Sequence, residues 1–185
     1  MSTVVLVDSR DESIGTAEKL QAHQRGLLHR AVSVFVFDSR DRLLVQRRAA
    51  GKYHGGGLWT NTCCSHPAPG ETPAVAAERR LFEEMGIRCE LRPAFAFLYR
   101  ADVGDGLIEH EYDHVFVGVS DAEPRPDPNE VGEFARHDPL TALRASIAHS
   151  SHWSVWFRLA LHELIGRSDK LAAPSSLGLE SLSKG

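Results

Sequence analysis

Short apolar runs, each about the length of one strand, dominate the first half of the chain. Residues 4–7 (VVLV), 31–37 (AVSVFVF) and 43–47 (LLVQR) are runs of this kind. The second and third are separated only by a polar turn sequence, DSRD at 38–41, so they predict an antiparallel hairpin. Further strands are predicted at 58–60, 94–100, 107–119 and 131–136.

The strongest helix signal lies at residues 73–85. Thr72 suits the N-cap, Pro73 suits the first helical position and Gly86 suits the residue after the last turn. Apolar side chains recur there at helical spacing, which predicts that the buried face consists of Ala74, Ala77, Leu81 and Met85. The charged residues Arg79, Arg80, Glu83 and Glu84 are expected elsewhere on the helix.

Three more helices are predicted. Thr16 is expected to cap a helix that ends near His23, and Asp138-Pro139 opens a short helix over 139–145. Residues 152–165 carry apolar side chains at helical spacing. Residues 167–185 lack periodicity and are predicted to be a loose C-terminal tail. This order predicts one domain over residues 1–166, with an α/β (α+β) fold in which helices sandwich a mixed sheet.

Composition narrows the class of protein. The 185 residues are 42% hydrophobic, enough to bury a core, and the net charge of −4 without a long basic run argues against nucleic-acid binding. No apolar run approaches the roughly 20 residues that span a bilayer, and no secretory signal is evident, so we expect a cytoplasmic protein without a membrane segment. Three cysteines, an odd number, favour reduced thiols.

The predicted helix at 73–85 carries a motif. Glu71, Arg79, Leu81, Glu83, Glu84, Gly86 and Ile87 match the Nudix box, G-x5-E-x7-R-E-U-x-E-E-x-G-U, in which U is aliphatic. Paired carboxylates on such a helix can hold Mg²⁺ against a diphosphate. Ser65 replaces the first Gly of the box, and Arg80 replaces a metal-binding Glu. The simpler alternative is a solvated helix face with i,i+4 ion pairs.

Two further clusters contain candidate metal ligands. Cys64 and His66 stand two residues apart in WTNTCCSHP, a spacing compatible with a metal pair or an activated thiol, or simply with an inert cysteine and a loop histidine. Glu109 and Glu111 alternate within a predicted strand, so both carboxylates project from one face while His110 projects from the other. Such crowding favours a bound cation or a shared proton, unless the face is exposed.

Taken together, WTNTCCSHP, RRLFEEMG and the EHE that follows LYRA resemble the type I isopentenyl diphosphate isomerases, a branch of the Nudix superfamily. The resemblance covers about residues 4–165. It implies a Nudix fold and the interconversion of isopentenyl and dimethylallyl diphosphate by protonation and deprotonation. These isomerases do not keep the intact hydrolase box, so the resemblance also accounts for Arg80.

The resemblance implies a role for each of several residues. A Mn²⁺ or Zn²⁺ site would be formed by His23, His29, His66, Glu109 and Glu111. Glu84 would hold Mg²⁺ with the substrate diphosphate, and the phosphates would be bound by Lys19, Arg48, Lys52 and Arg80. Cys64 and Glu111 would transfer protons on opposite faces of the substrate, with Tyr99 assisting Glu111. The ring of Trp156 would stabilise the developing carbocation, although simple packing is the alternative.

The resemblance implies no flavin or nucleotide cofactor, a small isoprenoid diphosphate as the partner, and a monomer or weak dimer. Two other functions stay open: a Nudix pyrophosphohydrolase, which Arg80 opposes, and a non-catalytic diphosphate-binding module, which has no need of Cys64 with Glu111. The Gly55-Gly56-Gly57 run fits either a mobile turn or a backbone approach to phosphate. Structural or solvated roles are expected for His54, His110, His114, His149 and His152.

Overall fold

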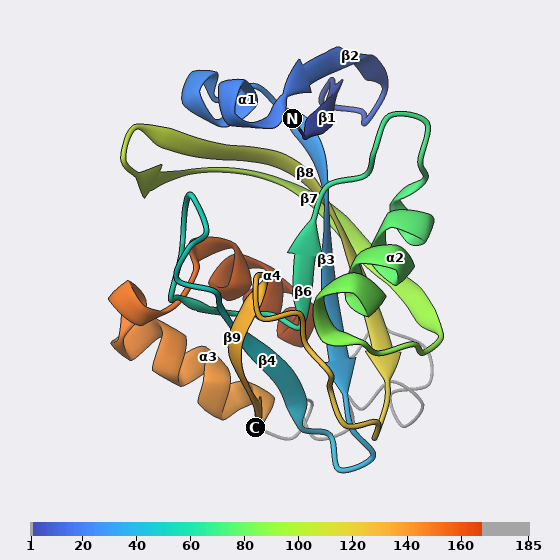
Figure 1. Ribbon diagram of the computed structural model, residues 1–185, viewed down its shortest axis with the longest axis vertical. Helices are drawn as coiled ribbons and strands as arrows, with labels where there is room; N and C mark the ends of the chain where they lie inside the picture. The colour runs from blue at the N-terminus through green and yellow to red at the C-terminus, as the bar shows by residue number, and fades with distance from the viewer. Residues whose placement is uncertain (1, 168–185) are drawn as a thin grey trace.

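A computed structural model describes residues 2–167 of the chain (Figure 1). The predicted tail at 167–185 lies outside the described residues except for Arg167, which follows the last helix. Among the residues described, no helix is both long and apolar enough to cross a membrane.

The strand β3 (His29–Phe37) is the centre of a mixed sheet. It pairs in parallel with β8 (Leu107–Val119) and antiparallel with β1 (Thr3–Val7), β4 (Leu43–Arg48) and β6 (Cys63–Ser65). The remaining strands extend the sheet beyond these neighbours: β2 (Ser13–Glu18) pairs with β1, β5 (Trp59–Thr60) and β9 (Val131–His137) with β4, and β7 (Leu91–Gly104) with β8. All but one of the β3 residues are buried, which explains its nearly continuous apolar sequence.

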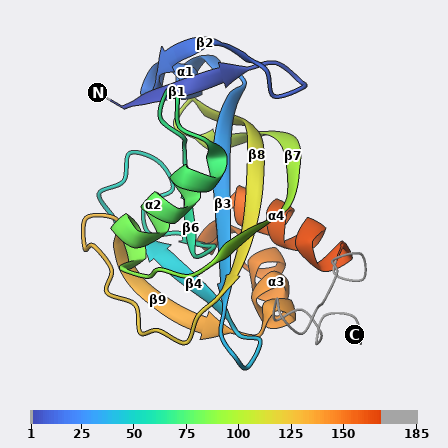
Figure 2. The same cartoon turned by 90° about the vertical axis from the view of Figure 1, so that its right-hand side faces the viewer.

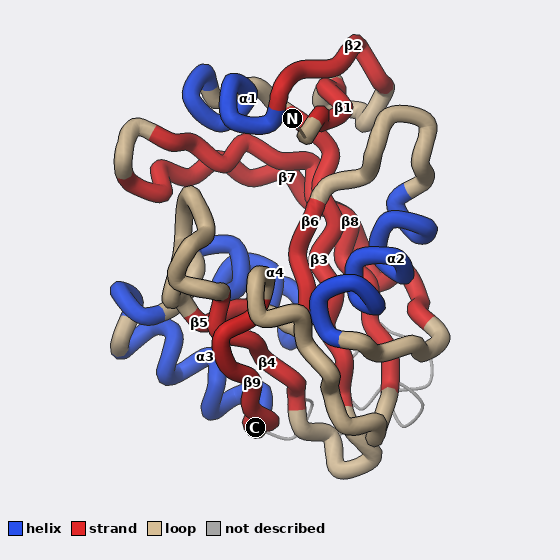
Figure 3. Tube along the Cα trace, in the orientation of Figure 1, coloured by secondary structure: helices blue, strands red, loops and turns tan. Residues whose placement is uncertain are grey.

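Side chains that alternate along β3 form two separate cores. Val32, Val34 and Val36 pack with buried residues of α2 (Pro73–Met85). Phe35 and Phe37 pack instead with α4 (Val155–Gly166) and residues of α3 (Pro139–Ala148). Figures 2 and 3 show α2 on one side of the sheet and α3 and α4 on the other. The predicted sandwich is therefore confirmed.

The helix α2 has the predicted ends but a different buried face. Thr72 accepts a hydrogen bond from the Val75 amide, and Gly86 adopts the left-handed conformation that ends the helix. The prediction for Ala74 was wrong, because Ala74 is exposed while Ala76 and Glu84 are buried. Alanine is too weakly hydrophobic to show which face of a helix is buried. A pattern of apolar residues also cannot identify a buried carboxylate.

The N-terminal region corrects the prediction for Thr16. Thr16 lies in β2 opposite Val5, and the helix α1 (Lys19–Arg25) begins later. Glu18 caps it, with its Oε2 accepting from the Gln21 amide at 2.9 Å. Thr16 cannot cap the helix because it is still paired with β1, and the helix begins only where that pairing stops.

The other predicted elements are present with shifted bounds. The hairpin of β3 and β4 exists, but only two residue pairs join the strands because β4 then pairs with β5 and β3 with β6. Helix α3 runs to Ala148, three residues beyond the predicted end. The predicted helix at 152–165 is divided into a 3-10 turn, Ser150–His152, and α4.

Gly86 should tolerate alanine poorly. Its φ is +66°, and a Cβ there would lie 2.6 Å from the Arg125 carbonyl oxygen. We expect Gly86→Ala to lower the free energy of unfolding by roughly 1–3 kcal/mol in a denaturant titration. Gly70 is the matched control, because its φ is +83° but a Cβ would meet no atom within 4 Å. Equal losses for the two variants would contradict the close approach at Gly86.

Candidate active site

Two buried carboxylates on β8 form the base of the site. Glu109 and Glu111 are 3% and 7% exposed, and the alternate residues His110 and Tyr112 are more accessible. Sheet register adds two neighbours to Glu111: His29 lies beside it on β3 and Tyr99 lies beside it on β7. The Tyr99 hydroxyl donates to Glu111 Oε2 at 2.6 Å.

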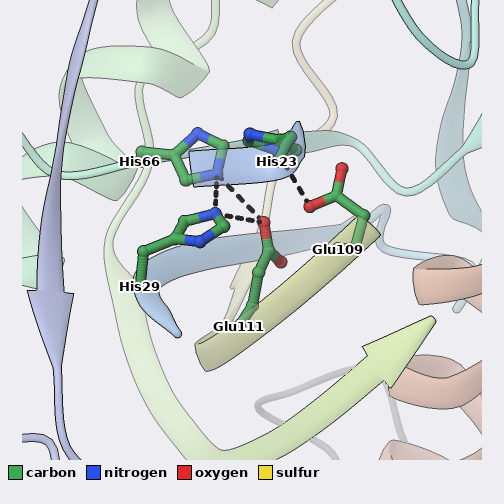
Figure 4. A group of neighbouring side chains, drawn as sticks. All are labelled: His23, His29, His66, Glu109 and Glu111. Carbon is green, nitrogen blue, oxygen red and sulfur yellow. Dashed lines mark hydrogen bonds and ion pairs between the residues drawn. The ribbon is translucent and has the colours of Figure 1, made fainter. Parts of the chain in front are cut away.

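Two more histidines join this group from outside the β3–β8 pair. His23 comes from α1, and His66 follows β6 directly. The nitrogen and oxygen atoms that could act as ligands in all five side chains lie within 4.8 Å of one another: His23, His29, His66, Glu109 and Glu111 (Figure 4). Residues 88 positions apart in the sequence thus converge on one point.

The hydrogen bonds of the histidines suit metal ligation. His23 Nδ1 lies 2.7 Å from the Lys19 carbonyl oxygen, and His29 Nδ1 lies 2.8 Å from the Leu27 carbonyl oxygen. A carbonyl only accepts, so each Nδ1 carries the hydrogen, and in the neutral ring Nε2 presents its lone pair to the cluster. His29 Nε2 is also 3.2 Å from His66 Nε2. Lone pairs gathered in this way, beside two carboxylates, fit a divalent cation.

The protonation tendencies agree with this interpretation except at His23, where burial lowers the pKa but contact with Glu109 raises it overall. Burial alone would raise the pKa of Glu109, but contacts with His23 and His54 hold it well below the usual range. Burial and the Glu109 charge oppose ionisation of Glu111, yet its contacts with His29 and His66 lower its pKa. Burial, with the positive charge of Lys19, keeps the pKa of His66 well below its ordinary value. The cluster therefore favours ionised carboxylates and a neutral His66, the forms in which these groups bind metals.

Register also separates the two adjacent cysteines. Cys64 pairs with Ser33 and Cys63 with Val34, so their side chains leave opposite faces of the sheet. Cys63 packs in the α2 core, whereas Cys64 lines a cavity with Glu109 and Glu111. Burial raises the pKa of Cys64 to about 12, although Arg48 acts in the opposite direction. The Cys64 thiol therefore holds its proton near neutral pH.

The inner cavity is small, and an aromatic ring, that of Trp156, forms part of its lining. Its volume is about 30 Å³, and Lys19, Arg48, His54 and Trp156 complete its lining. The Arg48 guanidinium lies 5.4 Å from the centre of the Trp156 ring and 3.6 Å from the Cys64 sulfur.

A wider polar cleft of about 570 Å³ adjoins the inner cavity and shares Lys19 and His66 with it. Its lining includes Lys52 and Arg80, both of which contact the Glu130 carboxylate. Three of the four predicted phosphate-binding cations thus line this cleft, while Arg48 lines the inner cavity. Arg47, beside Arg48, is exposed and pairs with Glu133.

Glu84 lies apart from the five-residue cluster. Its Oε2 accepts from Gln46 Nε2 at 2.9 Å, and its Oε1 accepts from Arg80 at 2.7 Å. The i,i+4 ion pair considered as an alternative for Arg80 therefore forms, but around a carboxylate that is only 4% exposed. Glu71 and Arg79 pair through two hydrogen bonds of 2.7 and 2.8 Å, which ties the loop before α2 to the helix.

Sequence reasoning missed His54, Glu130 and Gln46. His54 was expected to be structural or solvated, but it is buried with Nε2 2.5 Å from Glu109 Oε1. Its place in an irregular glycine-rich segment was the available signal. Glu130 and Gln46 carry no pattern that would mark them. Of the other unassigned histidines, His110 contacts the Gly26 carbonyl and His114 contacts Asp11, while His149 and His152 are exposed.

Comparison with known proteins identifies the family. Residues 27–157 match the NUDIX domain family. Isopentenyl-diphosphate Delta-isomerase 2 of Aromatoleum aromaticum is 55% identical over 88% of this chain and 86% of its own length. The isopentenyl-diphosphate Delta-isomerase of Pectobacterium atrosepticum is 48% identical over 86% and 89%, and that of Streptomyces coelicolor is 51% identical over 88% and 87%. The chain belongs to the isopentenyl-diphosphate Delta-isomerase family.

Solved structures agree on the fold of this family member. DR0079 from Deinococcus radiodurans matches with a TM-score of 0.74 at 21% identity, covering 88% of this chain and 99% of that chain. A MutT protein from Methanosarcina mazei matches with a TM-score of 0.62 at 17% identity, covering 78% and 96%. The predicted Nudix fold and the predicted family are both confirmed.

Removing divalent metal should destabilise the protein. Chelator-treated protein is expected to show a lower Tm by calorimetry, because a ligand bound only to the native state stabilises it by about 2.7 kcal/mol at 100 times its Kd. Re-addition of Mn²⁺, Zn²⁺ or Mg²⁺ should restore the Tm and the activity. His29→Ala should lose the response to metal, whereas the exposed His152→Ala should keep it. Full activity and an unchanged Tm in verified metal-free protein would rule out the site.

Proposed function

We propose that this chain interconverts isopentenyl diphosphate and dimethylallyl diphosphate, in isoprenoid biosynthesis, by adding a proton at one carbon and removing one at another. One observation carries the proposal: the Cys64 thiol and the Glu111 carboxylate line the same small cavity. Moving a double bond by one position needs two such groups, because one carbon must gain a proton and another must lose one.

Cys64 and Glu111 are the proton-transfer groups in this proposal. The raised pKa of Cys64 and the lowered pKa of Glu111 mean that one group starts with a proton and the other without. The thiol gives a proton and the carboxylate takes one, so exchange with solvent must return a proton from Glu111 to Cys64 before the next turnover, and in the reverse reaction the two groups exchange tasks. Tyr99, bonded to Glu111 Oε2, holds that carboxylate in place and can relay its proton.

A metal ion such as Mn²⁺ or Zn²⁺ would be held by His23, His29, His66, Glu109 and Glu111, the residues whose donor atoms converge. Bound there, it supplies positive charge that keeps the carboxylates ionised and fixed in orientation. Glu84, buried beside the cationic cleft, is the residue proposed to hold Mg²⁺ together with the diphosphate. The proposal requires no flavin or nucleotide cofactor.

The substrate diphosphate is proposed to bind Lys19, Arg48, Lys52 and Arg80. Three of these line the outer cleft and Arg48 continues the set inward, so the hydrocarbon end would point toward Cys64 and Glu111. The Trp156 ring lines the inner cavity and is proposed to stabilise carbocation character. Its contact with Arg48 supports this role, because the ring already receives a cation on its face.

The remaining features of the proposal are a cytoplasmic location, a monomer or weak dimer, and no nucleic-acid or membrane partner. Together with the small-molecule substrate, these features describe an enzyme that acts on small isoprenoid diphosphates without a macromolecular partner. The acidic net charge of −4 is in keeping with the absence of a nucleic-acid partner.

Replacing Cys64 tests the mechanism directly. Cys64→Ser and Cys64→Ala should stay folded and bind metal but lose about 10²–10⁴-fold in kcat, because neither side chain donates a proton as a thiol does. Cys63→Ala and Cys89→Ala are the controls and should stay active, with some loss of stability at the buried Cys63. The measurement is conversion of isopentenyl diphosphate to dimethylallyl diphosphate. A near-parental rate for Cys64→Ala would exclude this acid–base pair.

Hydrolysis should be negligible. Arg80 stands where the hydrolase box has a metal-binding carboxylate, and its guanidinium is bonded to Glu83, Glu84 and Glu130. We expect no release of phosphate or pyrophosphate above background from nucleoside or isoprenoid diphosphates in a colorimetric assay. Rapid turnover of a nucleoside diphosphate derivative would favour a hydrolase instead.

A further inference from the structure

His54 contacts the proposed metal site without being one of its five converging residues. It lies in the loop between β4 and β5 and is 7% exposed. Its Nε2 is 2.5 Å from Glu109 Oε1, while the other oxygen of that carboxylate, Oε2, is 3.1 Å from His23 Nε2. The two oxygens of Glu109 are thus divided between His54 on one side and the histidine cluster on the other.

The contact identifies which nitrogen of His54 carries hydrogen. An ionised carboxylate only accepts, so Nε2 must donate to Glu109. His54 Nδ1 is buried and has no hydrogen-bond partner among the residues described. In His23 and His29 the hydrogen is instead on Nδ1, which is bonded to a backbone carbonyl. His54 therefore presents a donor to the site, in contrast to the lone pairs that His23 and His29 present.

The loop that carries His54 is held in place by backbone contacts. The Gly57 amide donates to the Arg48 carbonyl at 3.0 Å, and the Arg48 side chain donates to the His54 carbonyl at 3.3 Å. A Cβ at Gly56 would lie 2.6 Å from the Ala50 carbonyl oxygen, and one at Gly55, whose φ is +59°, would lie 3.2 Å from Trp156. The glycine run thus allows a tight turn that seats His54 against the site.

The His54 ring also packs against the inner wall. Its centre lies 5.9 Å from that of Trp156 and 5.2 Å from that of His23. His54 therefore bridges the metal cluster and the aromatic wall of the inner cavity. Both contacts limit rotation of the ring, which fixes the direction of the Nε2–H bond toward Glu109.

We propose that His54 is a positioning residue that orients Glu109 for metal binding by donating its Nε2 hydrogen to Oε1, which leaves Oε2 facing the histidine cluster. The inference rests on the proposed metal site and adds a residue to which the family resemblance assigned no role. Hydrogen-bonded partners of metal-binding carboxylates typically contribute 10–100-fold to metal affinity. His54 should contribute on that scale.

The test separates the donor from the ring. In His54→Gln the side-chain amide can still donate to Glu109, whereas His54→Phe keeps the ring against Trp156 but has no donor. Mn²⁺ binding to the purified, chelator-treated full chain is followed by the electron paramagnetic resonance signal of free Mn²⁺. We expect His54→Phe to raise the Kd for Mn²⁺ about 10–100-fold and His54→Gln to stay close to the parental value.

Two further variants complete the test. His54→Asn has a donor too short to reach Glu109, so it should bind as weakly as His54→Phe and can replace that variant if Phe impairs folding. His152→Ala removes an exposed histidine and should bind Mn²⁺ as the parental chain does. Circular dichroism of each variant establishes that it is folded.

The outcomes distinguish this inference from the metal site itself. If the parental chain binds no Mn²⁺, the metal site fails and the inference fails with it. If the parental chain binds Mn²⁺ and a folded donor-free variant binds equally tightly, the role of His54 is overturned while the metal site stands. Equal weakening in His54→Gln and His54→Asn would also overturn it, because the donor would then be irrelevant.

Discussion

Two carboxylates buried side by side on one strand impose the strongest constraint on this protein. Glu109 and Glu111 cannot both be ionised in a low-dielectric interior unless positive charge or hydrogen donors surround them. The surrounding groups meet this requirement from separate elements, with His54 in the loop between β4 and β5, His66 after β6 and Tyr99 on β7. The groups that stabilise the ionised carboxylates are also arranged in a way that fits a divalent cation.

The parallel pairing of β3 with β8 gives these side chains their positions. It sets His29 beside Glu111, and the antiparallel pairing of β6 with β3 sets Cys64 on the face of Ser33 rather than on that of Val34. A one-residue shift of β8 or of β6 along β3 would move the side chains of the shifted strand to the opposite face. The two hydrophobic cores, one on each face of β3, therefore fix the register on which the site depends.

Charge is divided between the two parts of the site. The outer cleft contains cations around Glu130, whereas the inner cavity joins a thiol, carboxylates and an aromatic ring. Arg80 belongs to the outer part, where it bonds to Glu84 as well as to Glu130. The residue that departs from the hydrolase box thus lines the cleft that is proposed to bind the diphosphate.

Local signals in the sequence determined the ends of α2, the positions of the strands other than β2 and β6 and, through three motifs, the family. Period-two spacing was enough to place Glu109 and Glu111 on one face, because alternation along a strand is a local property. Tertiary structure alone decided that Thr16 lies in a strand, that Glu84 is buried and that His54 contacts Glu109. Thr16 depends on the pairing of β2 with β1, whereas the burial of Glu84 and the contact of His54 depend on the packing of segments distant in the sequence, and no local pattern of residues records which segments will meet.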